Sequence, residues 1–194
     1  MAELRTYGVP TFVARLPELL DVYRRAFLEV YESDPEQATG ERRALMQQHR
    51  YRPGLRLATF EDEKDKIVGF CYSYHGTPGH WWHDVVFRAL NGPDRAEWLS
   101  NCREIVELHV LPDYQGQGLG RQLLRAALAD SSETTAVLSA LDIEGTRAMR
   151  LYGSEGFRPL LSRFQFPGTA TRYVILGKEL TTADATTTPT VGAS

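Results

Sequence analysis

The sequence predicts an α/β protein, of the mixed α+β kind, whose mixed central sheet of six to seven strands carries helices on both faces. Two observations predict this class. Segments with the alternation of a strand recur between segments with helical periodicity, and three glycines within five residues join one such strand to the helix that follows. Some strands follow one another without an intervening helix, which favours antiparallel pairs beside parallel ones. The 194 residues suffice for one domain with a full core.

The first part of the chain is expected to contribute two helices and two strands. Pro17 suits the first turn of an amphipathic helix, and the charged segment 61–66 suits a solvated turn between antiparallel strands. In chain order the expected elements are a helix over 11–31, a second and more charged helix over 36–48, and strands over 55–60 and 66–74.

The second part alternates strands and helices and then closes with two strands. The expected elements are a strand over 102–111, a helix over 118–129, a strand over 135–141, a helix over 146–153, and strands over about 157–166 and 172–180. The tail over 181–194 is rich in Thr and Ala and poor in apolar residues, so we expect it to be flexible. The predicted domain therefore spans residues 1–180.

Composition narrows the function classes. A net charge of −3 gives no argument for binding nucleic acid or anionic membranes, and no apolar run approaches the ~20 residues that span a bilayer. The N-terminus lacks a secretory signal. Cys71 and Cys102 fit buried thiols, and no His/Cys cluster has metal-ligand spacing. We expect a cytoplasmic protein without a metal, and without nucleic-acid or membrane partners.

The most informative segment is the turn that contains Gly116, Gly118 and Gly120. An apolar strand runs into it and a helical pattern runs out, so free backbone N–H groups and the helix dipole converge on one point and can hold a phosphate. A P-loop needs Lys after its last glycine, where Arg121 stands, and the dinucleotide pattern also fails. Glycines that only form a tight turn are the alternative.

The spacing that does fit is Gln115-x-x-Gly118-x-Gly120. It resembles the pyrophosphate-binding signature of the GNAT family of N-acetyltransferases. A second motif, Leu151-Tyr152 followed by Gly156-Phe157, resembles the family's short helix and the strand after it. Together the two motifs cover about residues 102–160. The resemblance implies the GNAT fold, acetyl-CoA as co-substrate and transfer of an acetyl group to a primary amine by direct attack in a ternary complex.

The resemblance also implies how acetyl-CoA is held. The backbone of the turn binds the phosphates, with these residues as candidates: Gly116, Gln117, Gly118, Leu119, Gly120 and Arg121. The side chain of Arg121, with Arg125 one turn later, can neutralise phosphate charge. The pantetheine arm is expected to pair like an added strand with Leu108, His109 and Val110.

Tyr152 and Glu104 are the expected catalytic residues. By resemblance, Tyr152 lies near the sulfur of CoA and protonates the leaving thiolate; a core Tyr on a helix face is the alternative. Glu104 matches a glutamate that deprotonates the amine through water in the family's histone-type members. Glu107 competes with it, because strand alternation turns the two carboxylates to opposite faces unless a bulge changes the parity. His109 is a further candidate base.

Two departures from the family pattern affect these expectations. Gly145 stands where the family usually has an Asn, so one contact to CoA is not carried over. The family's acetylases of protein N-termini have a glutamate on the strand over 135–141, near Ser139 and Ala140, and its absence here argues against that subgroup. Two alternatives also stay open: transfer of another acyl group or to a hydroxyl, and a catalytically silent CoA-binding module.

Residues 75–101 are the least family-like part, and we expect an insertion there with a short helix over 85–90. The expected acceptor is a small-molecule or peptide amine. Its slot is expected to be lined by aromatic residues, namely Tyr72, Tyr74, Trp81 and Trp82, with Asp84 suited to a cation. The alternative for the tryptophans is to anchor the insertion to the core. A homodimer is a further expectation, because C-terminal edge strands often dimerise in the family.

Overall fold

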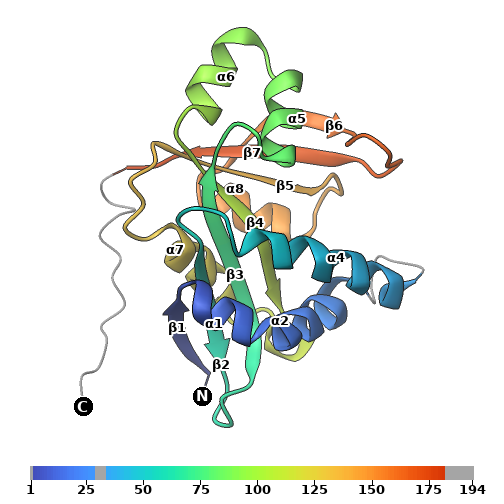
Figure 1. Cartoon of the computed structure of the whole chain (residues 1–194), viewed down its shortest axis with the longest axis vertical. Helices are drawn as coiled ribbons and strands as arrows, with labels where there is room; N and C mark the ends of the chain where they lie inside the picture. The colour runs from blue at the N-terminus through green and yellow to red at the C-terminus, as the bar shows by residue number, and fades with distance from the viewer. Residues whose placement is uncertain (1, 29–33, 182–194) are drawn as a thin grey trace.

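The computed structural model describes residues 2–28 and 34–181, which form one seven-stranded mixed sheet with helices on both faces (Figure 1). The sheet order is β1-β2-β3-β4-β5-β7-β6, and β4–β5 is the parallel pair. The strands are β1 (Glu3–Tyr7), β2 (Arg56–Glu61), β3 (Ile67–Gly76), β4 (Cys102–Val110), β5 (Thr135–Leu141), β6 (Arg158–Phe164) and β7 (Tyr173–Glu179). The predicted mixed sheet of six to seven strands is confirmed.

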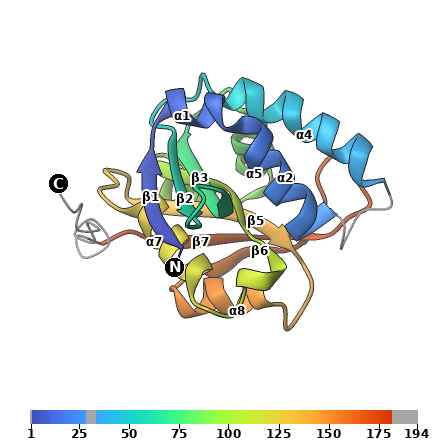
Figure 2. The same cartoon turned by 90° about the horizontal axis from the view of Figure 1, so that it is seen from below.

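The helices cover the sheet in two layers. Figure 2 shows α1, α2 and α4 on one face and α7 and α8 on the other. The helical segments are α1 (Val9–Ala14), α2 (Leu16–Tyr23), the π-helical turn η1 (Arg24–Leu28), α4 (Pro35–His49), α5 (Trp81–Ala89), α6 (Gly92–Leu99), the 3-10 turn η2 (Pro112–Tyr114), α7 (Leu119–Leu128) and α8 (Arg147–Ser154). Because the sheet is covered on both faces, its central strands β2 and β3 are buried almost throughout.

The prediction of one helix over 11–31 is wrong. The chain breaks at Arg15, whose φ of −99° and ψ of 10° end α1 and precede α2. Pro10 and Pro17 each stand in the first turn of a helix, where a missing N–H costs nothing, so the sequence starts two helices where one was expected. Residues 29–31 of that prediction lie outside the described residues.

Strand β1 was not predicted; it is a half-buried edge strand that pairs antiparallel with β2 from Glu3↔Glu61 to Tyr7↔Leu57. Every other predicted strand, and the predicted helices from α4 onward outside the 75–101 segment, agree with the structure to within two residues. The helix start at α4 has a local cause: the side chain of Asp34 accepts a hydrogen bond from the N–H of Gln37. Of the predicted flexible tail, residues 182–194 lie outside the described part of the chain.

The segment over 75–101 folds into the two helices α5 and α6, so the expected short helix over 85–90 is wrong in extent. These helices form a second apolar core with β5 and β7, which includes Val86, Trp98, Val137 and Ile175. The packing is close: a Cβ at Gly177 would lie 2.6 Å from the ring of Trp98. The helix pair is therefore fixed against the sheet.

The sheet opens between β4 and β5. Their pairing comprises Cys102↔Thr135, Arg103↔Ala136 and Glu104↔Val137, and the rest of β4 then runs on without a strand on that side in the described structure. Backbone N–H and C=O groups along the free edge of β4 can accept another extended chain, as at any open sheet edge. This opening positions the candidate site.

Candidate active site

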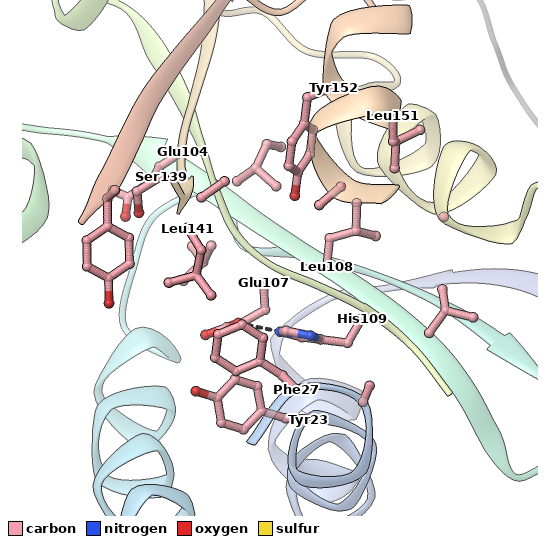
Figure 3. Close-up of a pocket in the computed structure, with 18 of the residues that line it drawn as sticks. Tyr23, Phe27, Glu104, Glu107, Leu108, His109, Ser139, Leu141, Leu151 and Tyr152 are labelled. Atoms are coloured by element: carbon pink, nitrogen blue, oxygen red, sulfur yellow. Dashed lines mark hydrogen bonds and ion pairs between the residues drawn. The ribbon is translucent and has the colours of Figure 1, made fainter. Parts of the chain in front are cut away.

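A cleft of about 1360 Å³ occupies the opening between β4 and β5. One end, which we call the phosphate end, is lined by the glycine turn, the start of α7 and one face of α8. The other end, which we call the acceptor end, is lined by residues of α2, η1, α4, α5 and the β6–β7 connection. Glu104, on β4, and Tyr152, on α8, stand on either side of the cleft in Figure 3.

The glycine turn has the backbone conformation that its residues predict. Gly116 and Gly118 have φ angles of +79° and +81°, which L side chains rarely adopt, and Gly118 precedes the first turn of α7. Gln115 ties the turn to its neighbours: its Nε2 donates to the carbonyl of Val110 (2.9 Å), and its Oε1 accepts from Arg147 (2.8 Å). The motif residue Gln115 thus connects the end of β4 with α8.

The cleft lining contains most of the residues that the sequence assigned to CoA. It includes Leu108, His109, Val110, Gly116, Gly118, Leu119, Gly120 and Arg121. Gln117 is not part of the lining, and its side chain donates to the carbonyl of Asp113 instead. The free edge of β4 and the positive φ angles at the turn fit an extended arm that ends in a pyrophosphate.

The arginines at the phosphate end differ from the expectation. Arg121 lines the cleft and Arg125 does not, and both side chains form ion pairs with Glu155, the residue that follows α8. Sequence reasoning missed Arg147 and Arg150, which line the cleft from α8. Their three-residue spacing on a predicted helix, beside the second motif, was the signal that could have found them.

A bulge in β4 turns Glu104 and Glu107 to the same face of the sheet. Tyr72 pairs with Glu107 and Tyr74 with Glu104, and since these tyrosines are two residues apart on β3, they and their partners share a face. The register shifts between Tyr72 and Ser73, which leaves one extra residue in β4. The sequence left open whether a bulge would turn these two side chains to the same face. The bulge is present, and both carboxyl groups line the cleft.

Glu104 is buried with one oxygen satisfied. The hydroxyl of Tyr74 donates to its Oε1 (3.1 Å), and its Oε2 has no hydrogen-bond partner in the described part of the chain. Burial raises the pKa of Glu104 to about 8, although the Tyr74 hydrogen bond and the charge of Arg52 act in the opposite direction. A carboxylate of this kind readily takes up a proton near neutral pH.

Glu107 is buried as well, but it is held by two partners. Its Oε1 lies 2.8 Å from Nη1 of Arg42, and its Oε2 lies 2.6 Å from Nε2 of His109. Burial opposes its ionisation, and the two partners more than offset this, so the pKa of Glu107 is lowered. The ring of His109 packs against Tyr23 and Phe27, and Figure 3 shows these four residues together at the acceptor side.

Tyr152 lies across the cleft on α8. Its side chain is 8% exposed, and its ring contacts Phe157 at 5.8 Å between centroids. Burial, together with the neighbouring Cys71 and Glu107, raises the pKa of the Tyr152 phenol above its ordinary value. The phenol therefore keeps its proton over the physiological range.

The acceptor end is aromatic, as expected from Tyr74, Trp81 and Trp82, all of which line it. Trp81 remains 57% exposed beside Phe166, with ring centroids 5.4 Å apart. Trp82 also anchors the helix pair, because its Nε1 donates to Ser139 on β5 (3.2 Å). Trp82 thus lines the cleft and also ties α5 to β5.

Two residues expected at the acceptor end do not line it. Tyr72 is fully buried, and its hydroxyl lies 2.9 Å from Nδ1 of His49. Asp84 accepts a hydrogen bond from the N–H of Gly79 (3.0 Å) and fixes the start of α5. Their roles are structural because local hydrogen bonds claim both polar groups.

Other features of the described residues bear on the reaction class. Cys71 and Cys102 are free, buried thiols, and neither lines the cleft. Among the residues that the structure describes, no group of three or more His, Cys, Asp or Glu side chains can hold a metal ion. Within the same residues, no helix has the length and apolar character needed to cross a membrane.

Comparisons with known proteins agree with this geometry. The sequence model of the acetyltransferase (GNAT) family matches residues 16–157. The chain is 37% identical over 121 residues to a GCN5-like protein acetyltransferase of Mycobacterium tuberculosis, a match that covers 59% of each protein and so less than two thirds of that relative's length.

Solved structures show the same fold at low sequence identity. The PaiA N-acetyltransferase of Thermoplasma acidophilum, in complex with coenzyme A, aligns with a TM-score of 0.61 at 14% identity, covering 93% of this chain and 99% of that one. YncA of Salmonella typhimurium, solved with its cofactor acetyl-CoA, aligns with a TM-score of 0.58 at 18% identity, covering 93% and 95%.

Proposed function

This chain belongs to the GNAT family of acetyltransferases, and from that premise we propose that it transfers the acetyl group of acetyl-CoA to a primary amine. The observation that carries the proposal is Glu104, a buried carboxyl group with a pKa of about 8 and an unpartnered Oε2, in a cleft that ends at the glycine turn. Two of the similar proteins are a protein acetyltransferase and an N-acetyltransferase, which supports an amine as acceptor.

The donor site is assigned to the phosphate end and the free edge of β4. The backbone N–H groups of the turn bind the pyrophosphate, and Arg121, Arg147 and Arg150 supply positive charge around it. The edge of β4 over 108–110 pairs with the pantetheine arm. When bound, acetyl-CoA supplies an acetyl group activated as a thioester.

Glu104 is assigned the role of general base. A base works best when its pKa lies near the operating pH, and burial moves the carboxyl of Glu104 into that range. Its free Oε2 accepts a proton from the attacking amine, directly or through one water. Glu107, the competing candidate, is held as a carboxylate by Arg42 and His109 and is less suited to exchange protons.

Tyr152 is assigned the role of general acid. Its raised pKa keeps the phenol protonated, so it can donate a proton to the departing sulfur. Direct attack by the amine is supported by the placement of Cys71 and Cys102, since neither thiol reaches the cleft to carry an acyl group.

The test has two stages. Calorimetric titration with acetyl-CoA, free CoA and longer acyl-CoAs establishes which acyl donor binds, and acetyl-CoA is expected to bind more tightly than the bulkier forms. The protein is then mixed with acetyl-CoA and a panel of primary amines, with thiol release and product mass as readouts. Binding of CoA without release of thiol from any amine would overturn the proposal in favour of a silent CoA-binding module.

A further inference from the structure

Arg52 is a cation at the acceptor end that the proposed chemistry leaves unused. It follows α4, where its backbone N–H donates to the carbonyl of His49 (2.9 Å), and its side chain is partly buried in the cleft lining. Its Nε is buried without a hydrogen-bond partner, and its guanidinium has no ion pair among the described residues. A partly desolvated guanidinium without an anion is costly unless a ligand supplies one.

The surroundings of Arg52 place it beside the proposed base. Its guanidinium carbon lies 6.0 Å from the ring centroid of Tyr74, whose hydroxyl donates to Oε1 of Glu104. Glu104 therefore meets Tyr74 at its hydroxyl, Arg52 lies over its ring, and both line the cleft. Each has a buried polar atom without a partner in the described structure, Oε2 of Glu104 and Nε of Arg52.

Among the described residues that line this end, Arg52 is the arginine without an ion pair. The other guanidinium here, that of Arg42, is paired with Glu107. The nearby histidines are neutral at pH 7: burial and then the charge of Arg52 lower the pKa of His49 to about 4 and lower that of His80. A carboxyl group with one unpartnered oxygen and a guanidinium without an ion pair in the described structure thus line the same aromatic end of the cleft.

We propose that Arg52 binds a carboxylate of the acceptor while Glu104 receives its amine, so that the substrates are primary amines with a carboxylate on the same molecule. This inference rests on the proposed function and narrows its substrate class. The planar guanidinium suits a carboxylate because it can donate two parallel hydrogen bonds. The carboxylate can be that of a free amino acid, or that of an acidic residue beside a lysine in a peptide.

The experiment compares matched acceptors that differ in the carboxylate alone. The free-amino-acid arm uses L-phenylalanine against L-phenylalaninamide, and the peptide arm uses a blocked Gly-Lys-Asp peptide against its Gly-Lys-Asn counterpart. The kcat/KM ratio of acid to amide is measured for the wild type and for Arg52→Gln. Comparing the ratio between the two proteins cancels the different basicities of the amines.

We expect Arg52→Gln to lower the acid-to-amide ratio by about tenfold or more in one arm, as the loss of a charge-assisted hydrogen bond predicts, and the responding arm identifies the source of the carboxylate. Arg52→Lys should restore part of the ratio because it keeps the charge. Arg43→Gln removes a charge from an exposed position of α4 outside the cleft lining, and its ratio should equal that of the wild type.

Two results would overturn the inference. Acetyl transfer with the same ratio in wild type and Arg52→Gln, in both arms, would remove the carboxylate from the substrate class and leave the proposed function intact. No acetyl transfer to any amine of the panel would remove the proposed function and this inference with it. A structural role of Arg52 alone would lower kcat/KM for acid and amide equally and so would also leave the ratio unchanged.

Discussion

The hydroxyl of Tyr74 donates a hydrogen bond to Oε1 of Glu104 over 3.1 Å, and it is the hydrogen bond that the described structure gives to this carboxylate. The two residues pair across β3 and β4, at the point where β4 parts from β5. The pair is buried, so the hydrogen bond only partly offsets the cost of charge on Glu104. The pH behaviour of this protein is expected to follow from this pair.

The first prediction concerns activity against pH. If Glu104 is the base, kcat/KM rises with pH through an apparent pKa of about 8 as the carboxyl loses its proton. Glu104→Gln should lower kcat/KM by about 100-fold or more and abolish that rise. Tyr74→Phe removes a hydrogen bond that favours the charged form, so it should move the rise to higher pH. Profiles that coincide in all three proteins would rule out Glu104 as the base.

The second prediction concerns stability. The pKa of Glu104 is raised on folding from its ordinary value of about 4.3 to about 8, so between these values the folded state binds more protons than the unfolded state. Its contribution to stability is thus complete below about pH 4.3 and is lost as the pH rises through 8. Glu104→Gln should gain on the order of 2–4 kcal/mol over the wild type at pH 9 and little at pH 4.5. Urea unfolding at both pH values measures the free energy of unfolding of the two proteins. A difference between them that does not change with pH would contradict the prediction.

The third prediction concerns Tyr152. Tyr152→Phe keeps the ring packed against Phe157 and removes the phenolic hydroxyl with its acidic proton. We expect kcat to fall by roughly 10- to 100-fold, while the Kd for CoA changes by less than about threefold, because a general acid acts in the transition state alone. Stopped-flow thiol detection measures kcat, and calorimetry measures the Kd for CoA. Unchanged turnover across the pH range would leave Tyr152 as a core residue.

The fourth prediction separates phosphate binding from backbone strain. Gly118 and Gly79 have φ angles of +81° and +89°, and a Cβ on either would meet nothing within 4 Å. Gly118→Ala and Gly79→Ala should therefore each cost about 1 kcal/mol of stability. We expect only Gly118→Ala to weaken CoA binding as well, since the other position lies outside the cleft. Equal affinity of the two variants for CoA would mean that the turn is purely structural.

The fifth prediction concerns the fixation of α5 and α6 on the sheet. A Cβ at Gly177 would lie 2.6 Å from the ring of Trp98 and 2.8 Å from Leu160, so Gly177→Ala should destabilise the fold by about 1–3 kcal/mol. Gly40→Ala is the matched control: it lies in α4 with nothing within 4 Å and should be neutral or slightly stabilising. Thermal unfolding measures the unfolding temperatures of the two variants, and that of Gly177→Ala is expected to be the lower. Equal unfolding temperatures would show that the helix pair is loosely held.

Local chemistry explains what the sequence by itself determined. The turn over 115–120 could be predicted because a strand, glycines that permit positive φ and an amphipathic helix follow one another directly along the chain. The boundaries of most strands and helices could be predicted for the same reason, since periodicity and capping are properties of neighbouring residues. The prediction failed at the short edge strand β1, whose local signal is weak. It also failed where Pro10 and Pro17 each start a helix, because the two starts lie within one stretch of helical periodicity.

Tertiary structure decided which side chains meet. The bulge in β4 turns Glu107 into the cleft beside Glu104, and then Arg42, from a helix far away in the sequence, claims Glu107 and leaves Glu104 free. The same holds for Arg52, whose position beside Tyr74 no spacing along the chain predicts. Periodicity fixes which face a residue takes within its own element, but its partner and its burial depend on register and packing between distant elements, and these set the charge of each group in the cleft.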